Sequence, residues 1–224
     1  MFKNLLSFWK GKDFLSQVLE EFKSMLDDSE LMFRSVCARL LDGKDEPDLK
    51  QSIYDIDKKV NVLQKDIRKR IVEHLALQPT VDVTACLVLM SVVKDAERLG
   101  DYAKNLFEIT EFLEKPIDRA LFSQYFDEVD KDIISLFEQT RQAFIDTNVD
   151  MAASAWSHEK TIAKGCDEIV AKVAQSGLSV NEAVCFALIA RYFKRIVAHL
   201  VNIATSVILP LSDLDYFDER RVDD

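Results

Sequence analysis

The stretch Lys94–Asn105 reads KDAERLGDYAKN, and a second stretch 97 residues further along, Arg191–Asn202, reads RYFKRIVAHLVN. Sliding the sequence by this offset places Arg98 on Arg195, with apolar residues matching on either side. A smaller match at an offset of 102 residues relates earlier segments of the two halves. Self-similarity at a nearly fixed offset is the signature of a repeated structural unit. The sequence therefore predicts two tandem copies of one unit.

Outside these stretches the chain divides into segments with the apolar spacing of amphipathic helices. Glycine (5) and proline (4) are rare, so there are few places to interrupt a helix. Pro47, Pro79 and Pro116 fall where the apolar period breaks, and proline marks a helix boundary. We predict an all-α six-helix bundle of two three-helix repeats, with helices over residues 12–41, 48–77, 81–114, 117–146, 150–174 and 179–209. The expected domains are an N-terminal segment (1–12), repeat one (13–114), repeat two (117–212) and an acidic tail (213–224).

Charge and composition exclude several classes of protein. The net charge of −10 repels nucleic-acid phosphates and anionic lipid. The longest uncharged stretch, residues 196–212, is shorter than the roughly 20 apolar residues that span a bilayer. No secretory signal pattern opens the chain, and the four cysteines lack CxxC spacing. We expect a soluble cytoplasmic protein with buried, reduced thiols, neither nucleic-acid binding nor integral to a membrane.

The first residues have a composition of their own. Residues 1–14 place Phe2, Leu5, Leu6, Phe8 and Trp9 beside Lys3, Lys10 and Lys12. Two interpretations remain open: this segment packs onto the bundle or onto a dimer partner, or it docks on a membrane surface or another protein.

The motif at Lys94–Asn105 resembles the signature of the PhoU family, Leu-Glu-Arg-Ile-Gly-Asp-His/Tyr-Ala-x-Asn. Asp57–Ile67 resembles a second family motif, and Arg191–Asn202 resembles a damaged copy of the first. The resemblance covers residues 13 to about 210. It implies a six-helix protein that forms oligomers, often dimers, and acts as an adaptor between a phosphate transporter and a sensor histidine kinase. A related group of short bacterial proteins, often linked to low-affinity phosphate transporters, shares this fold.

The resemblance also implies a metal site, since some family members bind iron, zinc, magnesium or manganese through carboxylate pairs. Glu97 and Asp101 lie one turn apart on one helix face. Asp57 and Asn61, one turn apart on the preceding helix, would complete an oxygen-rich cage for a divalent or iron cation. The alternative is a solvated acidic face or a set of salt bridges.

Repeat two lacks this pattern. Lys194 stands at the position of Glu97, and Ala198 stands at that of Asp101. Ala163 replaces the amide of repeat one, and only Glu159 remains. A lysine among the ligands repels a cation, so we expect no metal there.

Other residues of the signature call for structural roles. Arg98 and Asn105 recur as Arg195 and Asn202, where the ligands are gone, so we expect them to bridge helices or satisfy backbone groups. Gly100 is expected to allow close approach of another helix or a ligand. His199 occupies the position of Tyr102 in the repeat, which indicates a packed aromatic position.

No pattern predicts catalysis. There is no phosphate-binding glycine loop, no Glu-x-x-His pair of the di-iron type and no Cys/His cluster. We interpret the chain as a PhoU-like regulator of phosphate uptake or its signalling that works by binding proteins. The alternative is a metal-binding or metal-storing helical protein whose acidic helix face is its function.

Overall fold

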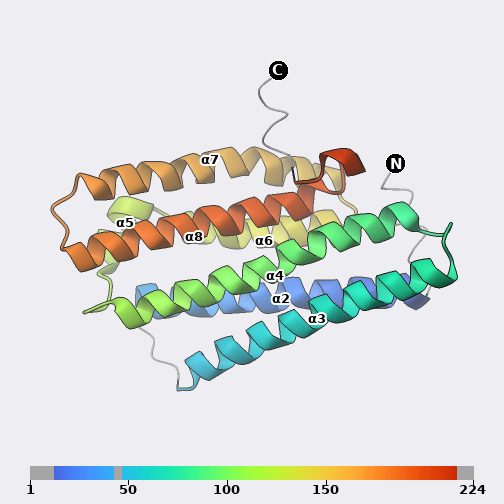
Figure 1. Ribbon diagram of the computed structural model, residues 1–224. Coiled ribbons are helices and arrows are strands. Elements are labelled where there is room, and N and C mark those ends of the chain that lie inside the picture. Colours follow the sequence, from blue (N-terminus) through green and yellow to red (C-terminus); the bar gives the residue numbers. More distant parts are fainter. Residues whose placement is uncertain (1–12, 43–46, 216–224) are drawn as a thin grey trace.

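The computed structural model describes residues 13–42 and 47–215, and every regular element in these ranges is helical (Figure 1). The predicted all-α bundle is confirmed. The N-terminal segment 1–12 and most of the tail lie outside the described residues. The elements are α2 (Asp13–Asp42), α3 (Leu49–Leu77), α4 (Val83–Phe112), α5 (Arg119–Phe126), α6 (Val129–Ile145), α7 (Val149–Ala174), α8 (Val180–Thr205) and the 3₁₀ turn η1 (Leu211–Asp213).

The helices form two groups that meet along the middle of the bundle. In Figure 1, α4 and α8 run side by side, with α3 at one edge of the molecule and α7 at the opposite edge. Helix α2 packs on α3 and α4, and α6 packs in the same way on α7 and α8. The two groups touch through α4 with α8 and through α2 with α6. The contact pattern of one group is thus repeated in the other.

One predicted helix is interrupted. The sequence predicts a single helix over 117–146, whereas the structure has α5 and α6 with a break at Asp127, whose φ is 53°. The break lets α5 place Phe122 and Phe126 against Phe186 of α8, with centroid distances of 6.3 and 5.5 Å. The prediction was wrong because apolar spacing continues through the break, and edge-to-face aromatic packing onto α8 accompanies the changed chain direction.

Side-chain caps define the start of the later helices. Ser179 and Glu182 form a reciprocal capping box at the first turn of α8. The Asn148 side chain accepts hydrogen bonds from the backbone N–H groups of Asp150 and Met151 at the start of α7. These contacts satisfy backbone donors that have no partner within the helix.

The core lies between α2, α4, α6 and α8 and is rich in phenylalanine. Phe33 of α2 packs against Phe137 of α6 at 5.8 Å and against Phe193 of α8 at 5.6 Å, so it joins the two groups of helices. Leu99 of α4 and Ile196 of α8, which match across the repeat, are both fully buried. Burial of such side chains stabilises the fold by about 1.5–3 kcal/mol each.

The four cysteines are buried and unpaired, as expected. Burial raises the pKa of Cys86 to about 11 and that of Cys166 to about 12, where the nearby Asp167 carboxylate adds to the effect. Thiols with such high pKa values carry little thiolate at neutral pH. Among the described helices, none combines the length and apolarity needed to cross a bilayer.

Candidate functional site

The structure brings the four predicted ligand residues onto facing turns of α3 and α4. Asp57 and Asn61 stand one turn apart on α3, with the Asn61 side-chain amide 3.5 Å from Asp57 Oδ2. Asp57 is buried, 9 % exposed as a residue, and Asp101 of α4 is half-buried. The grouping expected from helical spacing is therefore present.

The cation within this group is the ammonium of Lys104. Its Nζ donates to Asp57 Oδ2 at 2.9 Å and to Asp101 Oδ1 at 3.2 Å, and so ties α3 to α4. Desolvation lowers the pKa of Lys104, but the hydrogen bonds to the two carboxylates outweigh it, and the pKa rises above its ordinary value. The ammonium stays charged at neutral pH and balances the two carboxylates.

Glu97 stands apart from this bridge. Its carboxylate faces Arg98, with Oε2 3.7 Å from Nε, while the same guanidinium donates to Asp101 Oδ2 at 2.8 Å. Partial burial, followed by repulsion from Asp101 and Asp57, raises the pKa of Glu97. The carboxylates of Glu97, Asp101 and Asp57 therefore repel one another, and the side chains of Lys104 and Arg98 offset this repulsion.

These contacts do not fit a bound metal ion. In the described ranges, no three side chains of Asp, Glu, His or Cys converge on one point. Three of the carboxylate oxygens, Asp57 Oδ2 and both oxygens of Asp101, already accept hydrogen bonds from Lys104 or Arg98. A metal would have to displace the ammonium, because two cations cannot share this pair of carboxylates without strong repulsion. The arrangement is that of the predicted alternative, a network of salt bridges.

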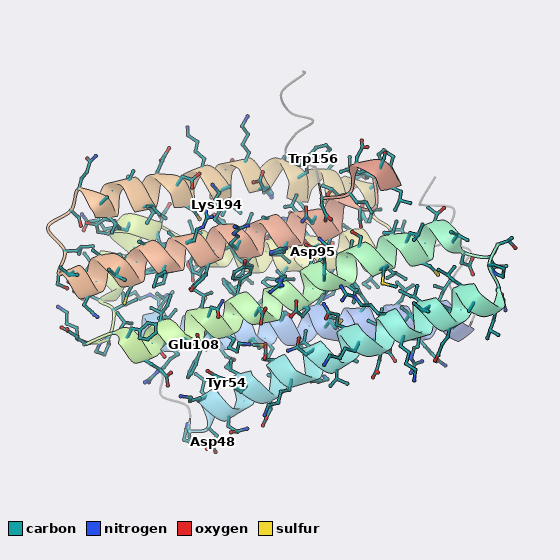
Figure 2. The ribbon with its side chains drawn as sticks, in the orientation of Figure 1. Asp48, Tyr54, Asp95, Glu108, Trp156 and Lys194 are labelled. Atoms are coloured by element: carbon teal, nitrogen blue, oxygen red, sulfur yellow. The ribbon has the colours of Figure 1, made fainter. Side chains whose placement is uncertain are left out.

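The equivalent positions of repeat two carry different chemistry. Lys194, at the position of Glu97, reaches across to α7 and forms an ion pair with Asp167 at 2.5 Å. Figure 2 labels Lys194 on the side of α8 that faces α7. Ala198 and Ala163 supply only methyl groups at the positions of Asp101 and Asn61, and Glu159 stands at that of Asp57. The ion pair of Lys194 with Asp167 joins α8 to α7, just as Lys104 joins α4 to α3 in repeat one.

A buried polar cluster that the sequence analysis missed lies between α4 and α8. Asp95 is fully buried, and its Oδ1 lies 2.7 Å from His199 Nδ1 and accepts a hydrogen bond from the Asn202 amide at 3.2 Å. The Lys94 ammonium is 3.6 Å from Asp95 Oδ2. Figure 2 labels Asp95 where the two helices run side by side. Its spacing offered a signal, since Asp95 interrupts the apolar stripe of α4 between Val92 and Leu99.

A second contact mirrors this cluster across the repeat. Tyr102 packs against Tyr192 with centroids 5.9 Å apart, and it stacks on His199 at 5.6 Å. In the repeat alignment, Asp95 of α4 corresponds to Tyr192 of α8, and His199 of α8 corresponds to Tyr102 of α4. The two contacts are therefore reciprocal, and they show that α4 and α8 run antiparallel. The packed aromatic position expected for His199 is confirmed, with an added hydrogen bond.

The structural roles expected for Arg98 and Gly100 need correction, whereas the bridging role expected for Asn202 is confirmed. Arg98 does not bridge helices: it is 54 % exposed and pairs with Asp101 of its own helix. Asn202 of α8 does bridge helices, because its amide donates a hydrogen bond to Asp95 of α4. Gly100 faces α2 and α3, but a Cβ there would lie 3.7 Å from the nearest atoms, Ser29 Oγ and Val60 Cγ1, which is ordinary contact. Close approach therefore does not require glycine.

Two three-helix groups with the same contact pattern, joined through the antiparallel helices α4 and α8, make this protein a two-repeat helical bundle. The family model described as "PhoU domain" matches residues 22–110 and 127–207, one segment in each half. The chain belongs to the PhoU family.

Relatives and solved structures agree with this assignment. A "Phosphate-specific transport system accessory protein PhoU homolog" of Caulobacter vibrioides is 20% identical over 82% of this chain and 82% of its own length. A "PhoU homolog 1" of Thermotoga maritima is 21% identical over 71% of this chain and 72% of its own. The crystal structure of PhoU from Pseudomonas aeruginosa aligns with a TM-score of 0.75 at 21% identity, covering 87% of this chain and 95% of that one. PhoU of Streptococcus pneumoniae aligns with a TM-score of 0.72 at 20% identity, covering 91% and 97%.

Proposed function

We propose that this protein is an accessory regulator of phosphate uptake that acts in the cytoplasm by binding other proteins. The observation that carries the proposal is the family match in both halves of the chain, together with relatives named as accessory proteins of a phosphate-specific transport system. The partners we propose are a component of the phosphate transporter and a sensor histidine kinase. Binding is the proposed mode of action because the polar clusters of α3, α4 and α8 consist of salt bridges and helix-to-helix hydrogen bonds.

The alternative function, metal binding or storage, has weaker support. It needs the carboxylates of Asp57 and Asp101, and Lys104 bridges both. Repeat two offers Lys194 and Ala198 instead of ligands. A protein that stores metal depends on many open oxygen ligands, whereas an adaptor keeps its shape with an internal ammonium in their place.

Deleting the gene tests the proposal. We expect altered uptake of radiolabelled orthophosphate and an altered phosphate-starvation response, both restored by the wild-type gene on a plasmid. Unchanged uptake and an unchanged starvation response in the deletion strain would contradict the proposal. The dimer implied by the family resemblance stays a prediction, and light scattering of the purified protein measures it directly.

A further inference from the structure

The outer side of α8 is basic in a protein whose net charge is −10. From Ala183 to Thr205 the helix contains no Asp or Glu, and its charged residues are Arg191, Lys194 and Arg195. Lys194 is neutralised by Asp167, but neither exposed arginine has an ion pair among the described residues. Their guanidinium groups are open to solvent.

The counterparts of these arginines in repeat one are neutralised. Lys94, which matches Arg191, pairs with Asp215 at 3.0 Å, and Arg98, which matches Arg195, pairs with Asp101 at 2.8 Å. Within residues 13–42 and 47–215, these two matched positions therefore lack an ion pair in repeat two and have one in repeat one. Arg191 and Arg195 are one helical turn apart, and like charges at this spacing repel each other. A negatively charged partner would relieve that repulsion.

Arg98 of α4 lies at the same level of the helix crossing as Arg195 of α8. It lies midway between Asp95 and Tyr102 on α4, and Arg195 lies midway between Tyr192 and His199 on α8. Because Asp95 contacts His199 and Tyr102 contacts Tyr192, the two arginines lie near the middle of the helix crossing, on its exposed side. We call the set Arg98, Tyr102, Arg191, Tyr192 and Arg195 the arginine face.

We propose that the arginine face is a docking surface for an acidic segment of a protein partner. Arginine and tyrosine are the residue types enriched at the centres of protein interfaces, because they combine a large contact area with charged or polar tips. The exposed side of two packed helices suits a protein chain better than a small anion, which would remain largely hydrated there. The net charge of −10 disfavours nucleic acid and anionic lipid, which present extended negative charge to the whole molecule.

The inference deepens the proposed function, since it names the surface through which the regulator binds, and it rests on that function for its biological meaning. Its physical content can be tested alone. The probe is a fluorescently labelled oligoglutamate peptide, whose binding is followed by anisotropy at low and high salt. The variant is R191Q/R195Q, and the matched control is K160Q/K164Q, which removes two exposed lysines at the same spacing on α7.

We expect the wild type and the control to bind the peptide, with affinity that falls as salt rises. The R191Q/R195Q variant should bind roughly tenfold more weakly while keeping the same helical circular dichroism and melting temperature. Equal binding by all three proteins, or no binding by the wild type, overturns the proposal. Arginine-dependent binding to a DNA duplex or to phosphatidylserine vesicles without binding to oligoglutamate also overturns it.

The deletion strain separates this inference from the proposed function. If the wild-type gene and R191Q/R195Q restore phosphate control equally, the arginine face is not the docking surface, although the proposed function stands. If deletion leaves phosphate uptake unchanged, the proposed function fails, and the peptide experiment still decides whether the face binds acidic chains.

Discussion

The two repeats use opposite chemistry at equivalent positions of the same helical frame. On α4, Lys104 lies between the carboxylates of Asp57 and Asp101, and the nearby Arg98 is also paired. On α8, Lys194 pairs with α7 while Arg195 is left open to solvent. The buried partners Leu99 and Ile196 are equivalent in both position and burial. Apolar positions therefore maintain the repeat, and the charged surface is free to diverge.

The largest expected effect concerns a core difference between the repeats. Phe193, fully packed against Phe33 and Phe126, occupies the position of Ala96 in repeat one. Phe193→Ala should lower the free energy of unfolding by about 3–5 kcal/mol, because it leaves a cavity among rings of α2 and α5. Urea denaturation measures the loss. Phe112→Ala, at a side chain 61% exposed, is the control and should change little.

The second effect concerns the asymmetric crossing of α4 and α8. Asp95→Ala removes the partner of His199 and Asn202, and leaving these partly buried polar groups unpaired should cost roughly 1–3 kcal/mol. The single variants Asp95→Leu and His199→Phe and the double variant Asp95→Leu/His199→Phe form a double-mutant cycle. The double variant should lose less free energy of unfolding than the sum of the two single losses, since it removes both partners. Strict additivity in urea denaturation would show that the two side chains do not interact.

The helix boundaries could be predicted from sequence because Pro47, Pro79 and Pro116 and the apolar period act locally. The break at Asp127 could not, since the stripe through Phe122 and Phe126 continues across it and the cause lies in packing against α8. Contacts between distant helices are outside the reach of a periodic pattern.

The candidate site could be predicted in part. Helical spacing grouped Glu97 with Asp101, and the family motif added Asp57. The role of Lys104 was missed because it depends on the reach of one side chain across two helices. Asp95 was missed although it interrupts an apolar stripe, because its partner lies on α8, 104 residues away.

The third prediction concerns the internal ammonium. Lys104→Met should lower stability by about 1 kcal/mol, since a half-buried bridge is lost and two carboxylates are left to repel each other. Because the pKa of Lys104 is raised in the folded state, its contribution is complete at neutral pH and disappears as the pH rises through that value. The variant should also bind Mn²⁺ more tightly than the wild type by calorimetry. Tight binding by the wild type alone would show that the carboxylates do serve as a metal site.

The fourth prediction concerns Gly100, where a substitution gives repeat one a side chain as repeat two has. Gly100 corresponds to Val197, which is fully buried, and a methyl group at Gly100 would meet its neighbours at ordinary contact distance. Gly100→Ala should raise the free energy of unfolding by up to about 1 kcal/mol, because alanine restricts the unfolded chain and favours helix. A lower melting temperature would mean that the α2–α4 packing does need glycine.

The smallest expected effect is at Glu97. Its raised pKa means that the folded state binds a proton more readily than the unfolded chain, so its charge opposes folding above that pKa. Glu97→Gln should stabilise the protein by on the order of 0.5 kcal/mol at neutral pH, and the gain should vanish as the pH falls through the raised pKa. Melting temperatures of both proteins across the acid range provide the measurement. A stability gain that is the same at every pH would show that it does not come from removing the charge of Glu97.

The proposed function and the arginine face together predict that phosphate regulation depends on Arg191 and Arg195 and not on Glu97 and Asp101. The most direct measurement is a phosphate-starvation reporter in the deletion strain, complemented with wild type, R191Q/R195Q or E97Q/D101N at equal protein levels. We predict that E97Q/D101N restores regulation as the wild type does, while R191Q/R195Q does not. Full restoration by R191Q/R195Q with failure of E97Q/D101N would show that the acidic residues of repeat one, and not the arginine face, carry the regulation.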